Sequence, residues 1–152
     1  MSMASSLGEQ MALKVVEIKE AVAGLSDEKA AKPPAAGEWS VKQVLSHLCE
    51  SNYEFKRFVD EDTPELGIFP GQHGDDHRDE PLGDLLSQFE SNYAEIGGFL
   101  SGLSDDQLSR KGRVALLKET PIGEYPTLGQ WAGAIINFHL ADHANQLRTL
   151  AQ

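Results

Sequence analysis

Two histidines, His139 and His143, lie four residues apart in a stretch whose apolar residues repeat at helical spacing. Residues four apart on an α-helix are separated by about 40° around its axis and about 6 Å along it, so both imidazoles project from one face. A bundle helix would ordinarily carry leucines at such positions. A divalent metal ion is the leading explanation for the pair, and the alternative is a pair of hydrogen-bonded histidines in the core.

Three further histidines are candidates for a third ligand: His47, His73 and His77. His73 and His77 are also four apart, but Gly71 and Gly74 argue against a helix that would align them. We therefore expect this second pair to stay outside the site. A separate, weak cation site at the pair is an open alternative.

Helices must position these side chains, and four long segments show helical periodicity. They run from about Leu7 to Gly24, from Ser40 to about Asp60, from near Pro81 to Gly102, and from Thr127 to near Ala151. Capping boxes predict helix starts at Ser40 and Thr127, and a third box predicts a short helix from Ser104 to Leu108. Strand-like alternation is limited to residues 113–117, so the predicted fold class is all-α, a four-helix bundle.

The segment Asp60–Glu80 joins the second and third helices with 21 residues, long enough at about 3.3 Å per residue to travel back along a helix of about 30 Å. It carries eight of the 24 acidic residues, which is typical of a solvated loop. Such a crossover makes helices two and three parallel and predicts an up-down-down-up bundle. Helices two and four are then antiparallel, which brings His47, about 10 Å into its helix, to the level of His139 and His143, about 15 Å from the end of theirs.

Composition narrows the function further. The 152 residues fit a single domain covering the whole chain, and the net charge of −11 argues against nucleic acid as a partner. Neither a signal sequence nor a membrane-spanning stretch is recognisable, so we expect a soluble cytoplasmic protein with no membrane partner. The single cysteine, Cys49, excludes an internal disulfide and a multi-cysteine zinc site, so a metal would depend on imidazole and oxygen ligands.

Three short sequence motifs carry a resemblance to a known protein family. Residues 37–40 read Gly-Glu-Trp-Ser, His47 follows within Val-Leu-Ser-His-Leu, and the last helix carries His-x-x-x-His. The pattern resembles the DinB-like (DNA-damage-inducible) superfamily. The resemblance implies that His47, His139 and His143 bind one divalent metal ion, commonly zinc or nickel, in an up-down-down-up bundle that forms a homodimer. It also implies a small-molecule substrate and a low-molecular-weight thiol such as bacillithiol, mycothiol or glutathione.

Three neutral imidazoles leave a coordination position open for water or a thiol, whose pKa the metal would lower. The leading functional hypothesis is a metal-dependent enzyme that transfers a small thiol to an electrophile or catalyses a related isomerisation. The alternatives are a metal-dependent hydrolase of a small substrate, a non-catalytic metal-binding stress-response bundle, and a bundle with no physiological metal. Leu140 stands where a His-Glu-x-x-His protease carries its glutamate, which argues against protease activity.

Glu50 and Glu54 are the candidates for a catalytic base, because both follow His47 by one to two helical turns. A solvated helix edge is the simpler interpretation of both residues. Asn137 and Asp142 are candidates for hydrogen-bonding the outer nitrogens of the ligand histidines.

Overall fold

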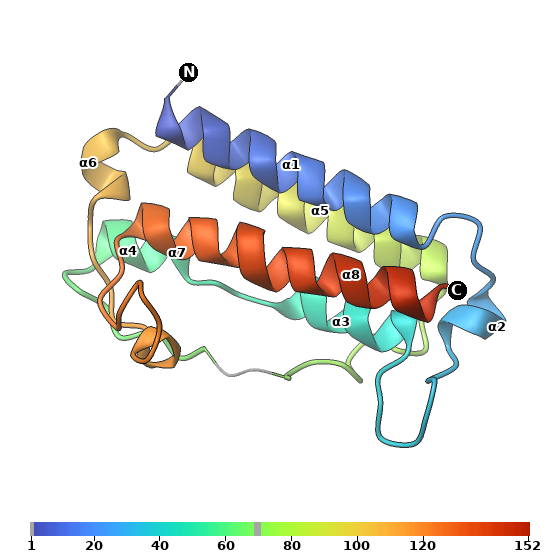
Figure 1. Ribbon diagram of the computed structural model, residues 1–152. Coiled ribbons are helices and arrows are strands. Elements are labelled where there is room, and N and C mark those ends of the chain that lie inside the picture. Colours follow the sequence, from blue (N-terminus) through green and yellow to red (C-terminus); the bar gives the residue numbers. More distant parts are fainter. Residues whose placement is uncertain (1, 69–70) are drawn as a thin grey trace.

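The computed structural model describes residues 2–68 and 71–152. It is a four-helix bundle (Figure 1), as the sequence predicts. The long elements are α1 (Met3–Ala21), α3 (Val41–Glu50) followed by the short α4 (Phe55–Asp60), α5 (Leu82–Ser101), and a last segment of α7 (Leu128–Ala134), η2 (Ile135–Leu140) and α8 (Ala141–Leu150). The connections carry α2 (Asp27–Ala30), α6 (Asp105–Leu108) and η1 (Ala115–Leu117).

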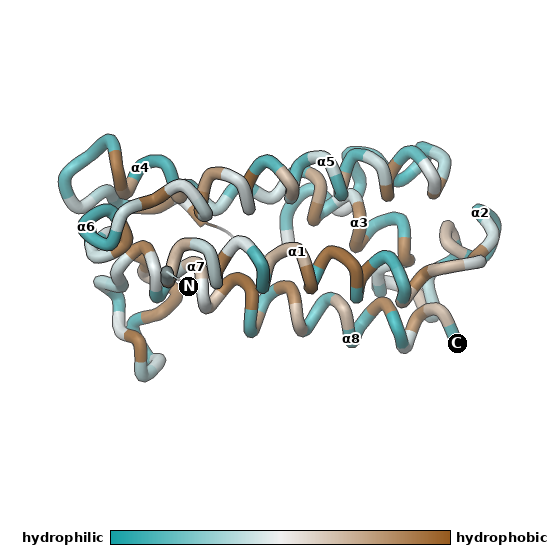
Figure 2. The backbone as a smooth tube through the Cα atoms, turned by 90° about the horizontal axis from the view of Figure 1, so that it is seen from above, coloured by the Kyte–Doolittle hydropathy of each residue, from teal (hydrophilic) through white to brown (hydrophobic). Residues whose placement is uncertain are grey.

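Local side-chain signals set the starts of three helices. All three predicted capping boxes are present, at the starts of α3, α6 and α7. The strand-like alternation at residues 113–117 produces no sheet in the described ranges: the segment forms one isolated bridge, between Glu65 and Arg113, and the 3-10 turn η1. Apolar residues recur along each long helix between hydrophilic ones (Figure 2), as amphipathic bundle helices require.

Side-chain contacts fix the direction of α1 relative to α5. Gly8, near the start of α1, lies against Ser101 at the end of α5, and Lys19 near the end of α1 bonds to Glu90 (2.6 Å). These two helices are therefore antiparallel. Figure 1 shows α1 and α8 running from left to right and α3 and α5 running back.

None of the helices in the described parts of the chain combines the length and the apolar character needed to cross a bilayer.

The remaining contacts fix the direction of α3. The side chain of Asn92 donates to the carbonyl of Cys49 (2.9 Å), and Tyr53, beyond the end of α3, reaches Tyr93, one residue further along α5. The helices α3 and α5 thus run in parallel. Tyr53 also meets Trp131, near the start of the last helical segment, so α3 runs antiparallel to that segment. The order of directions along the chain is up, down, down, up.

The second predicted helix, Ser40 to Asp60, is not continuous. It ends at Glu50, and residues 51–54 form a turn before α4 begins. Ser51 donates its hydroxyl to the carbonyl of His47 (2.6 Å), and the Asn52 side chain accepts from the amide of Glu54 (2.9 Å), whose φ is +56°. Such local side-chain bonds compete with the helical ladder. The expectation that Glu54 continues the helical face of His47 is therefore wrong.

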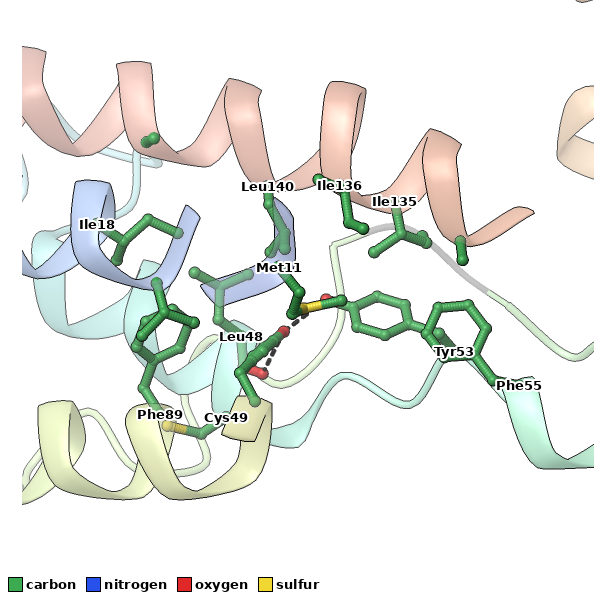
Figure 3. Packing of buried hydrophobic residues seen from close by; sticks show 14 of the residues in the cluster. Met11, Ile18, Leu48, Cys49, Tyr53, Phe55, Phe89, Ile135, Ile136 and Leu140 are labelled. Atoms are coloured by element: carbon green, nitrogen blue, oxygen red, sulfur yellow. Dashed lines mark hydrogen bonds between the residues drawn. The ribbon is translucent and has the colours of Figure 1, made fainter. Parts of the chain in front are cut away.

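Buried bonds to Tyr53 hold this turn in the core. The indole N–H of Trp131 donates to the Tyr53 carbonyl (2.8 Å), and the Tyr53 hydroxyl lies 2.5 Å from that of Tyr93. Because Tyr93 donates its own hydrogen to the Leu48 carbonyl (2.9 Å), Tyr53 must be the donor between the two phenols. Figure 3 places Tyr53 in the buried apolar cluster beside Phe55.

This chain of bonds predicts unequal effects of two matched substitutions. Tyr93→Phe leaves the buried Tyr53 hydroxyl without an acceptor and should destabilise the fold by about 1–3 kcal/mol. Tyr53→Phe leaves Tyr93 still bonded to Leu48 and should cost less, about 0.5–1.5 kcal/mol. Urea unfolding of both variants measures the difference. Equal losses would mean that the two hydroxyls do not act in this order.

Candidate metal centre

The structure brings His47, His139 and His143 together from three elements. His47 lies in α3, His139 in η2 and His143 in α8. One ring nitrogen from each lies within 4.8 Å of the others, and the ring centroids are 4.6 to 5.4 Å apart. No other group of three such side chains in the described residues brings its donor atoms this close. Three imidazoles in this arrangement can hold a metal ion.

A π-helical turn sets the position of His139. The segment η2 interrupts the α-helical pattern between α7 and α8, where the sequence predicts an uninterrupted helix. Ile136 and Leu140 are fully buried in the core, whereas His139 is half-buried at its edge. Inserted π turns are rare and recur at functional sites. The histidines therefore lie beside the core stripe of this helix instead of forming part of it.

Hydrogen bonds at the outer nitrogens select which atoms face the centre. The Nδ1 of His47 lies 2.6 Å from the carbonyl oxygen of Gln72, and the Nδ1 of His143 lies 2.8 Å from the Oε1 of Gln146. Both oxygens are acceptors, so each Nδ1 carries the hydrogen and each Nε2 keeps a free lone pair. The Nε2 of His139 is buried and has no hydrogen-bond partner. A metal ion would satisfy this orphaned atom.

Burial keeps the three rings neutral. It lowers the pKa of His47 and of His143, and it lowers the pKa of His139 to about 3. Neighbouring imidazoles oppose the protonation of His139 further. Metal ligation requires the neutral imidazole, so at pH 7 the site is in its binding form without the loss of a proton.

The partners of the outer nitrogens differ from those expected. Asn137 and Asp142 are exposed, and neither provides the acceptor for His47 or His143. Gln146 takes that role for His143, and a backbone carbonyl takes it for His47. The position of Gln146 three residues after His143 is a signal that the sequence does contain, since side chains with this spacing are neighbours on a helix.

The carbonyl of Gln72 belongs to a linker that is packed against α3 more closely than a solvated loop would be. Ser46 donates to the carbonyl of His73 (2.6 Å) and accepts from the amide of His77 (2.8 Å). Gly74 lies on the ring of Trp39, where an added Cβ would come within 2.7 Å of the indole. Residues 72–77 of the linker are thereby held beside the three histidines, with the side chains of Asp75 and Asp76 exposed.

The linker histidines do not join the site. The Nδ1 of His73 bonds to Asp76 (2.7 Å). The Nε2 of His77 bonds to Glu50 (2.5 Å), and its Nδ1 bonds to Glu80. Because both nitrogens of His77 face carboxylates, both must carry hydrogen, and these contacts raise the pKa of His77.

The raised pKa predicts a pH dependence that belongs to His77. Its contacts stabilise the fold fully below the ordinary histidine pKa of 6.5, and this contribution disappears as the pH rises through the raised value of the folded protein. His77→Gln should therefore differ most from wild type at low pH and least at high pH. Free energies of unfolding measured for both proteins between pH 5 and 9 test this, and a difference that is constant with pH would contradict it.

Both candidate bases, Glu50 and Glu54, line one cavity together with the three histidines. Each base already has a hydrogen-bond partner. Glu54 accepts from the Arg57 guanidinium (3.1 Å) with one oxygen and from the Gly67 amide (2.9 Å) with the other. Glu50 is exposed and uses one oxygen for His77. Glu54 thus holds Gly67 of the linker to the start of α4, whereas Glu50 has one carboxylate oxygen that His77 does not engage.

The cavity in front of the histidines has a volume of about 910 Å³. Its walls are formed by residues 50–54 at the end of α3, by residues 67–68 and 71–73 of the linker, by residues from 116 to 122, and by one face of the α7–η2–α8 segment. Small-molecule sites have volumes of about 300–1,000 Å³. The interruption of the second helix therefore provides space for a ligand beside the three imidazoles.

Comparison with known proteins agrees with this architecture. YfiT from Bacillus subtilis, described as "a probable metal-dependent hydrolase with an unusual four-helix bundle topology", superposes with a TM-score of 0.79 over 97% of this chain and 85% of its own, at 22% identity. No curated protein sequence matches the chain. Residues 16–147 match the sequence profile of the DinB superfamily, and the match covers α3, α5 and the turns that carry His139 and His143. The chain belongs to the DinB superfamily.

Proposed function

We propose that this protein is a metal-dependent enzyme whose single divalent ion, zinc or nickel, is held by His47, His139 and His143. The observation that carries the proposal is the unpartnered, buried Nε2 of His139 at the wall of a cavity of about 910 Å³. Three imidazoles leave a coordination position open, which is typical of catalytic rather than structural zinc sites. A bound divalent ion would lower the pKa of a coordinated water or thiol and polarise a substrate carbonyl.

Hydrolysis of a small substrate is the reaction we favour. The similar bundle YfiT is described as a probable metal-dependent hydrolase, and water needs no binding site beyond the open position. Glu50 is the residue we assign to proton transfer, since it lines the cavity and has an oxygen that His77 does not engage. Glu54 is assigned a positioning role, because Arg57 and Gly67 engage both of its oxygens.

Transfer of a low-molecular-weight thiol, the activity that the family resemblance implies, is the second candidate. The size of the cavity favours it, because about 910 Å³ has room for a thiol beside a small electrophile. The thiol would take the position that water takes in hydrolysis. The homodimer and the cytoplasmic location remain predictions.

The test uses untagged protein loaded with zinc or nickel and assayed with esters, amides and small electrophiles, with and without thiols. We expect metal-dependent turnover of at least one class. Glu50→Gln should lower kcat by about 10²–10⁴-fold, the usual contribution of a proton-transfer residue, with the metal content unchanged. His77→Gln is the control, because it removes the same ion pair and keeps the carboxylate. Full metal occupancy without turnover in any assay would favour the non-catalytic metal-binding bundle.

A further inference from the structure

A large part of the cavity lining is apolar. Six aliphatic or aromatic side chains contribute to its lining from the linker, from the loop around η1 and from η2. They are Ile68, Leu116, Leu117, Ile122, Ile135 and Phe138. Leu116 and Phe138 are 51% and 63% exposed, which is unusual for such large apolar residues. An apolar ligand in the cavity would cover part of this surface.

The described part of the cavity lining contains carboxylates but neither lysine nor arginine. Glu50 and Glu54 line the cavity, whereas their cationic partners, His77 and Arg57, do not. The net charge of the chain, −11, adds to the repulsion of an anion. Recognition of phosphate or of several carboxylates in proteins depends on arginine, lysine or clustered backbone amides. A bound metal ion would be the one strong positive charge in front of the substrate.

We propose that the substrate of this site is a molecule with an apolar, uncharged or cationic body that presents a single polar reactive group to the metal. The inference rests on the proposed function and narrows it. Phosphorylated substrates and thiols that carry several carboxylates fit the lining poorly, because beyond the metal they would place negative charge among apolar side chains and next to Glu50 or Glu54.

Three hydroxamates that share one metal-binding group test the proposal: acetohydroxamate, octanohydroxamate and the monohydroxamate of suberic acid, which has a chain of similar length ending in a carboxylate. Their affinities for the zinc-loaded full chain are measured by titration calorimetry. Octanohydroxamate should bind about tenfold or more tightly than acetohydroxamate, since its methylene groups leave water for the apolar part of the lining. The suberate probe should lose most of that gain.

A charge placed at the rim provides the matched variant. Thr120 is exposed and lines the cavity. Thr120→Lys should tighten the suberate probe by about two- to fivefold, the contribution of an exposed ion pair, whereas the neutral control Thr120→Gln should not. Equal affinities of octanohydroxamate and the suberate probe for the wild type would overturn the inference. Failure of acetohydroxamate to bind the zinc-loaded protein would instead overturn the proposed function, so the two results are distinguishable.

Discussion

Replacing His139 with leucine is expected to abolish metal binding and to make the metal-free protein more stable. The substitution removes one of the three proposed ligands. The loss of metal affinity should therefore exceed the roughly 10- to 100-fold loss that is typical when only a supporting residue is removed. The same substitution removes a buried Nε2 that has no hydrogen-bond partner. An unsatisfied buried polar atom costs about 1–3 kcal/mol, which leucine would recover in part.

Two measurements check this expectation. Elemental analysis of untagged protein gives the metal content, and urea unfolding in the presence of a chelator gives the stability of the metal-free form. Gln146→Leu is the matched control: it keeps all three imidazoles and frees the Nδ1 of His143, so metal affinity should fall by about 10- to 100-fold. Equal metal content in wild type and His139→Leu would exclude the three-histidine site. A metal-free variant that is less stable than wild type would identify His139 as a structural core histidine.

The histidine cluster is predictable because it depends on helix geometry. The spacing of His139 and His143 requires a shared face, and the heights along antiparallel helices select His47 over the linker pair. The supporting contacts are only partly predictable. Gln146 lies three residues after His143, and this helical spacing predicts their contact. The partner of His47 is the backbone carbonyl of Gln72, and its position depends on how the linker folds. Because every residue has a backbone carbonyl, the sequence does not indicate which one binds His47.

The cavity depends on two departures from regular helices, and the sequence indicates only one of them. Ser51 and Asn52 form local bonds that end α3, and both residue types favour such bonds over a helix interior. The π turn of η2 has no comparable signal, because Ile136 is followed at helical spacing by Leu140 as well as by His139. Packing decides between these two faces, and it buries Leu140.

Substitution of Trp131 by alanine should have the largest effect on stability. Trp131 is 4% exposed, and its indole donates to the carbonyl of Tyr53 in the turn that separates α3 from α4. Truncation of a buried aromatic side chain costs about 3–5 kcal/mol. The Tyr53 ring packs edge-on against that of His139, with centroids 5.6 Å apart, so loosening the turn should also weaken metal binding.

Trp131→Phe separates the two contributions of the indole. It keeps an aromatic ring in the core but removes the hydrogen-bond donor. The unpaired carbonyl of Tyr53 should lower the free energy of unfolding by about 1–3 kcal/mol, and the smaller ring should lower it a little further. The total loss should be smaller than that of the alanine variant. Urea unfolding and zinc titration of both variants measure stability and affinity in parallel. If Trp131→Ala lowers stability but binds zinc as wild type does, the turn at residues 51–54 encloses the cavity without positioning His139. Weaker zinc binding in both variants, in the order of their stability losses, would show that the position of His139 depends on this buried turn.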